Sequence, residues 1–87
     1  MHAVVVKVNL HDRDAAQAVL HDRVIPAVSK APGFVAGYWT TKDNTGLSML
    51  VFESEDAATD ASQMVRTTVP DAVTLEDVEV REVVGHA

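Results

Sequence analysis

The sequence predicts an α+β protein whose secondary-structure elements follow the order β-α-β-β-α-β. Three features favour this order: a valine-rich opening segment with alternating character, a turn between two strand-like segments near residues 42–46, and two segments with apolar residues at helical spacing. With 87 residues, the chain has the length of one domain and not of two. We therefore expect a single domain over residues 1–87.

The first strand is expected at residues 3–10, AVVVKVNL, because β-branched valines suit a pleated strand. Side chains alternate between the two faces of a strand, so Lys7 and Asn9 share one face. The opposite face is wholly apolar and consists of Val4, Val6, Val8 and Leu10. The apolar face is predicted to pack on the core.

Residues 12–31 have the pattern of an amphipathic helix, with Asp12 as its N-cap. Pro26 removes one backbone donor and crowds the preceding turn, so we expect a kink there or two helical pieces. Residues 31–33, Ala-Pro-Gly, are expected to end the helix. The apolar stripe consists of Ala16, Val19, Leu20, Val24, Ala27, Val28 and Ala31.

Two strands, at residues 34–41 and 47–53, are expected to form a hairpin. The connecting residues 42–46 contain Asn44 and Gly46, which can take positive φ. Within the first of these strands, Gly37 is expected to mark a bulge or a close approach of backbone.

The second helix is expected to begin after Ser54, a capping hydroxyl followed by two carboxylates, and to end at residues 69–71, Val-Pro-Asp. Its buried side is marked by Ala58, Ala61, Met64 or Val65, and Thr68. Met49 and Met64 are expected to fill the core. The last strand lies within residues 73–84.

This order is that of the ferredoxin-like fold, an antiparallel four-stranded sheet with both helices on one face. The first and last strands are then antiparallel neighbours. Matching their apolar faces and opposing their charges predicts a register. The expected pairs are Val6 with Val80, Val8 with Val78, Lys7 with Glu79, and Asn9 with Asp77.

Composition limits the classes of partner. The net charge of −6 argues against a nucleic-acid partner and against an anionic membrane surface. There is no cysteine, which excludes disulfides and thiol catalysis and fits a reducing compartment. The chain opens directly into a strand-like run, so we expect no signal peptide and no membrane span. A cytoplasmic protein is the expectation.

Two helices can cover only one face of the sheet. The other face keeps Val5, Val83 and parts of the two hairpin strands, and a small chain with such a face usually finds a partner. We therefore expect a homodimer through the open sheet face. Two sheets closing face to face would form a barrel with a central cavity.

Three segments carry a resemblance to a known family: "VVVKVNL" at the start, "APGFVAGYW" after the first helix, and "LVFESEDAA" before the second. Over nearly its whole length the chain resembles the dimeric α+β barrel superfamily, the group of antibiotic-biosynthesis-monooxygenase-like proteins, and is most similar to short actinobacterial members of unassigned reaction. The resemblance implies a cofactor-independent oxygenase acting on a small aromatic or polyketide-like molecule. The alternative is a non-catalytic ligand-binding or assembly module of the same fold.

Haem-degrading members of that superfamily carry an Asn on the first strand, which Asn9 matches. They also need a Trp and a His on the second helix, where this chain reads EDAATDASQMVRTTV. Since both are missing, haem degradation is disfavoured and no cofactor is expected.

Asn9 and Lys7 are the catalytic candidates. Asn9 could hydrogen-bond a substrate inside the barrel, or instead its own turn backbone. Lys7 could lower the pKa of a phenol, or instead pair with Glu79 across the strands or across the dimer.

Tyr38, Trp39 and His21 are the ligand-binding candidates. In a regular strand Tyr38 and Trp39 point to opposite faces, so at most one lines a cavity, and otherwise they anchor the dimer. His21 lies one position beyond the apolar stripe and is either a general base at a pocket mouth or a surface histidine. No spacing of His, Asp and Glu resembles a metal-binding motif, so no metal site is expected.

Overall fold

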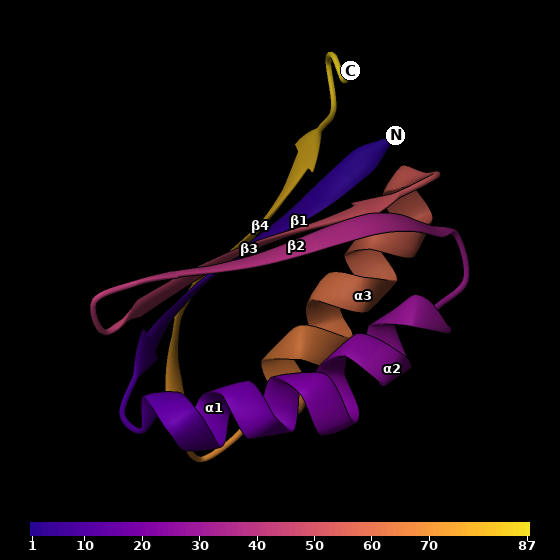
Figure 1. Ribbon diagram of the computed structural model, residues 1–87. Helices are drawn as coiled ribbons and strands as arrows, with labels where there is room; N and C mark the ends of the chain where they lie inside the picture. Colours follow the sequence, from indigo (N-terminus) through magenta and orange to yellow (C-terminus); the bar gives the residue numbers. More distant parts are fainter.

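The computed structural model describes residues 1–87 and has the predicted order of strands and helices (Figure 1). The strands are arranged β2-β3-β1-β4, and each neighbouring pair is antiparallel. The helices lie together on one face of this sheet (Figure 1), an arrangement that fits the ferredoxin-like fold. The elements are β1 (His2–Leu10), α1 (Arg13–Val19), the π-helical segment η1 (Leu20–Val24), α2 (Ile25–Ser29), β2 (Phe34–Lys42), β3 (Thr45–Phe52), α3 (Glu55–Thr67) and β4 (Val73–Glu82).

The first helical segment is divided, as Pro26 predicts. Asp12 is the N-cap of α1, and its carboxylate accepts a hydrogen bond from the backbone N–H of Ala15. The chain widens to a π-helix at Leu20–Val24 before α2 begins at Ile25. Pro26 cannot donate a backbone hydrogen bond, so the regular helical ladder is interrupted where the two pieces meet.

The core lies between the sheet and α3. Ser54 caps this helix by accepting a hydrogen bond from the backbone N–H of Ala57. Ala58 and Ala61 are buried, as expected. The core cluster consists of Val4, Val6, Val28, Leu50, Phe52, Ala58, Ala61 and Val78.

The expectation that two methionines fill the core is wrong. Met49 is 47% exposed because it lies on the face of the sheet that the helices leave open. Met64 is 39% exposed and belongs to the outer side of α3. Val65, the alternative to Met64 for the buried side of this helix, packs against the core.

The predicted register between β1 and β4 is wrong by two residues. Val6 lies opposite Val78, and Lys7 lies opposite Asp77, not Glu79. A slip of two residues keeps every side chain on its face, so alternation alone cannot detect it. Beyond Lys7, Val8 is opposite Leu75, which leaves Glu76 as an extra residue in β4.

The same correction applies to the polar partners of these strands. Asn9 lies opposite Thr74 and not Asp77. The Glu79 carboxylate pairs with Arg81, whose Nη2 lies 2.6 Å from its Oε2, so the predicted ion pair between Lys7 and Glu79 is not formed within the chain.

The hairpin of β2 and β3 is confirmed, but its turn is tighter than expected. Lys42 and Thr45 are the last paired residues, so only Asp43 and Asn44 form the loop. Asp43 takes the positive φ, at 55°, whereas Asn44 and Gly46 do not. Aspartate tolerates this conformation better than most residues do.

None of the helices combines the length and the apolar character that a membrane-spanning helix needs.

Candidate functional site

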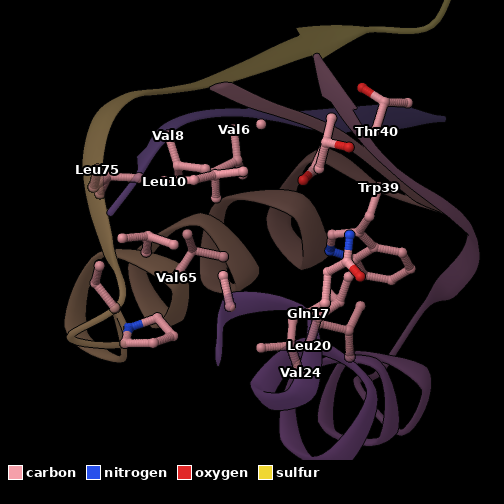
Figure 2. Close-up of a pocket in the computed structure, with 18 of the residues that line it drawn as sticks. Val6, Val8, Leu10, Gln17, Leu20, Val24, Trp39, Thr40, Val65 and Leu75 are labelled. Carbon is pink, nitrogen blue, oxygen red and sulfur yellow. The ribbon is translucent and has the colours of Figure 1, made fainter. Parts of the chain in front are cut away.

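A cavity of about 160 Å³ lies between the inner face of the sheet and the first helical segment (Figure 2). The sheet contributes Val6 and Val8 from β1 and Trp39 from β2, whereas η1 contributes Leu20 and Val24. Most of the lining side chains are apolar. The cavity therefore offers a mainly hydrophobic environment that is open to solvent on one side.

The cavity exists because the two helical regions approach the sheet differently. α3 packs along β1, β3 and β4. By contrast, α1, η1 and α2 do not pack closely against any strand. No residue of α1 or η1 is buried, and in α2 only Val28 is. The first helical segment thus stands away from the sheet, and the space below it is incompletely filled.

Gly37 makes room for the aromatic wall of the cavity. A Cβ atom at this position would lie 2.9 Å from Cη2 of Trp39 and 3.2 Å from Cζ of Phe34. The expected backbone approach at Gly37 is wrong, because the groups that come close are side chains, above all the indole ring of Trp39. The bulge of β2 is at Val35 instead, because Phe34 pairs with Phe52 while Ala36 pairs with Val51.

Gly46 has a similar role on the neighbouring strand. It is buried and lines the cavity, and a Cβ atom there would lie 2.8 Å from Cγ2 of Val8. Its lack of a side chain therefore lets Val8 extend into the layer between sheet and helix.

Six polar side chains also line the cavity: Ser48 from β3, Gln17 and Arg13 from α1, and the threonines Thr40, Thr41 and Thr68. Ser48 is half-buried, whereas Gln17 and Arg13 are exposed. Nη2 of Arg13 donates a hydrogen bond of 3.1 Å to Oγ1 of Thr41, which joins the start of α1 to the end of β2. The available chemistry is amide, hydroxyl and guanidinium hydrogen bonding beside an apolar surface.

The cavity lining contains no carboxylate, imidazole or lysine side chain. No group of three or more His, Cys, Asp or Glu residues is placed to hold a metal ion.

Of the residues proposed from sequence, only Trp39 lines the cavity. The predicted partition of the two aromatic residues is confirmed, because Tyr38 lies on the other face of the sheet and is 68% exposed. Lys7 and Asn9 are also exposed on that face, since the alternate residues Val6 and Val8 point into the cavity. His21 is an exposed residue of η1 and does not line the cavity.

Sequence analysis missed Gln17 and Ser48. Ser48 carried a usable signal, because it is a polar residue at an inward position between Gly46 and Leu50. Gln17 lies four residues after Arg13 and three before Leu20, on the same side of the helix. A polar residue next to an apolar stripe is common, so this spacing alone would not have selected it.

The open face of the sheet is a second candidate surface. Cross-strand pairing places Tyr38 beside Met49 and Met49 beside Val5. Leu47, which is 51% exposed, lies on the same face beside Lys7. The charged residues Asp77, Glu79 and Arg81 follow along β4, so the apolar area has a charged border.

A scan against protein-family models found no match for this chain, and a search of curated proteins found none either. The structure on its own shows an α+β architecture that fits the ferredoxin-like fold. The resemblance to the dimeric α+β barrel superfamily stays an interpretation of the sequence. Because one fold serves many functions, function is argued from the cavity and from the open sheet face.

Proposed function

We propose that this chain binds a small, mainly apolar molecule with one aromatic ring in the cavity between the sheet and the first helical segment. The cavity volume of about 160 Å³ is the observation that carries this proposal. Apolar cavities of about 150 Å³ in other proteins accept benzene. The cavity therefore has room for a single ring and not for a fused polyketide-like system.

The lining side chains suit such a ring. The indole of Trp39 offers an aromatic partner, and aromatic pairs prefer offset or edge-to-face contacts. The hydroxyl of Ser48 and the amide of Gln17 can each donate or accept a hydrogen bond. A phenolic hydroxyl or a similar substituent would match these two groups.

The second candidate function is cofactor-independent oxygenation of a bound phenol to a quinone, in which the substrate supplies the electrons, one atom of dioxygen enters the ring and the other leaves as water. Arg13 favours it, because a guanidinium beside the cavity stabilises an ionised phenol over a neutral one. In this version Gln17 and Ser48 would orient the substrate. Lys7 and Asn9 would take part only in a reaction inside a barrel formed by two chains.

The open sheet face supports a homodimer. Tyr38, Leu47 and Met49 are each largely exposed on that face in the single chain. Burying such side chains against a second copy would stabilise both chains at about 25 cal/mol per Å². A barrel of two sheets in a reducing, cytoplasmic setting is the assembly we propose.

Light scattering tests this assembly. A homodimer at micromolar concentration is expected for the unaltered chain, and Met49→Glu should weaken it because a charge would be buried at the seam. A monomeric unaltered chain would rule out the barrel.

Ligand binding is tested by thermal unfolding with phenol, toluene, hydroquinone and benzoate. A compound at ten to a hundred times its dissociation constant should add about 1.4–2.7 kcal/mol of stability. Ser48→Ala should weaken the binding of phenol relative to toluene, whereas Tyr38→Phe on the opposite face should leave it unchanged. If no compound stabilises the protein, ligand binding is wrong. If a compound binds but no oxygen is consumed, the proposal of ligand binding stands and the proposal of an oxygenase is wrong.

A further inference from the structure

An open groove lies on the outer side of the first helical segment. It has a volume of about 700 Å³ and runs between the segment η1–α2 and the end of α3 with the loop that follows it. The groove and the cavity have six lining residues in common: Val24, Val28, Val65, Thr68, Val69 and Pro70. The two hollows are therefore separated only by a shared rim of side chains.

This rim is made of side chains that come from separate parts of the chain. Val24 belongs to the π-helical segment, whereas Val69 lies in the loop after α3. Figure 2 shows Val24 and Val65 coming from η1 and α3, the two regions between which the groove runs. A chain-like substituent of a ligand in the cavity would leave between these regions.

Most of the residues that line the groove are apolar. Val19, Ala27, Met64 and Ala72 line the groove and not the cavity. Its two charged residues, Arg23 and Asp71, have opposite sign. Since the groove has no net charge, it favours an uncharged aliphatic chain over an ionised one.

We infer that the ligand of this protein is an aromatic ring with a short, uncharged alkyl chain, the ring lying in the cavity and the chain in the groove. This inference rests on the proposed function, because the cavity must first hold the ring. Six of the groove's twelve lining residues also line the cavity. The groove is therefore expected to hold the alkyl chain of the ligand in the cavity, and not a separate partner.

The test is a series of 4-alkylphenols, from phenol through ethyl and butyl to hexyl. Binding is measured from the fluorescence of Trp39, the only tryptophan and a residue of the cavity wall. Excitation at the red edge of the indole band avoids absorption by the phenols. Affinity should rise by up to about fourfold for each added methylene, until the chain leaves the groove.

Substitution of Met64 can remove the gain in affinity with chain length without affecting the binding of the ring. It lines the groove, is 39% exposed and does not line the cavity. Met64→Glu should abolish the gain with chain length and leave phenol binding unchanged, whereas Met64→Leu should keep both. Gln63→Glu adds the same charge to a neighbouring exposed residue that lines neither hollow, and should keep the gain.

The outcomes separate the inference from the proposed function. If phenol binds but affinity does not rise with chain length, or rises equally in Met64→Glu, the inference is wrong and the proposed function stands. Failure of every member of the series to change Trp39 fluorescence or thermal stability would overturn both. A gain lost only in Met64→Glu supports the inference.

Discussion

The two helical regions cover the same face of the sheet in different ways. α3 is unbroken over Glu55–Thr67 and buries the small residues Ala58, Ala61 and Ser62, which allows a close approach. The segment from Arg13 to Ser29 is divided by η1 and buries only Val28. This difference shows that one helical region of a small domain can form the core with the sheet while the other leaves space for a ligand.

The largest expected effect comes from the region packed by α3. Phe52 is fully buried and makes an edge-to-face contact with Phe34, with ring centroids 5.7 Å apart. Phe52→Ala should lower the free energy of unfolding by about 3–5 kcal/mol, because it leaves a cavity in a closed core. Urea denaturation measures this loss. A loss below about 1 kcal/mol would show that the α3 side is as loosely packed as the α1 side.

Gly46→Ala tests the floor of the cavity. The new Cβ would lie 2.8 Å from Cγ2 of Val8, a stiff β-branched side chain, so we expect a loss of stability of about 1–3 kcal/mol. Gly85→Ala is the matched control, because a Cβ there meets nothing within 4 Å. Equal thermal stability of the two variants would mean that Val8 can move aside and that the cavity floor is soft.

The N-cap residues of α3 and α1 allow the stability of the two helical regions to be compared. Ser54→Ala should cost about 1 kcal/mol, because it removes the hydrogen bond that starts the helix packed on the core. Asp12→Ala removes the same kind of bond at the start of α1. Its cost should be smaller, because α1 can open locally while the core persists.

Native-state amide hydrogen exchange checks the same difference. Slower exchange in α3 than in α1 and η1 is expected, and equal protection would contradict the comparison.

The smallest stability effect is expected for Leu20→Ala. Leu20 is half-buried and borders the cavity, so the change should cost less than about 1 kcal/mol, well below the usual cost for a closed core. Ligand binding should weaken, because the wall of the cavity recedes. A cost near that of Phe52→Ala would mean that Leu20 belongs to the core.

The fold was predictable because its signals are local. The valine alternation of β1, the capping residues Asp12 and Ser54, and Pro26 each act within a few residues of their position. The β1–β4 register was not predictable from alternation, which a two-residue slip preserves. The extra residue Glu76 adds a second change of pairing that alternation does not specify.

The candidate site was predictable only in part. Alternation along β2 correctly separated Trp39 from Tyr38. Lys7 and Asn9 were expected to contact the ligand because a ligand was expected inside a barrel of two sheets. The cavity instead depends on how far the first helical segment stands from the sheet, a distance that no local pattern of residues encodes.

The π-helical segment has a consequence for the phase of α1. The hydrogen bonds of a π-helical turn span one residue more than those of an α-helical turn, whereas each residue of an α-helix advances the chain by about 100°. Deleting one residue of Leu20–Val24 would therefore let this turn become α-helical and leave α1 in nearly its present phase relative to α2. If the segment kept all its residues and became α-helical, α1 would rotate by about 100°, and Gln17 and Arg13 would turn away from the sheet. The polarity of the cavity thus depends on the π-helical hydrogen bonding of one turn as much as on the side chains themselves.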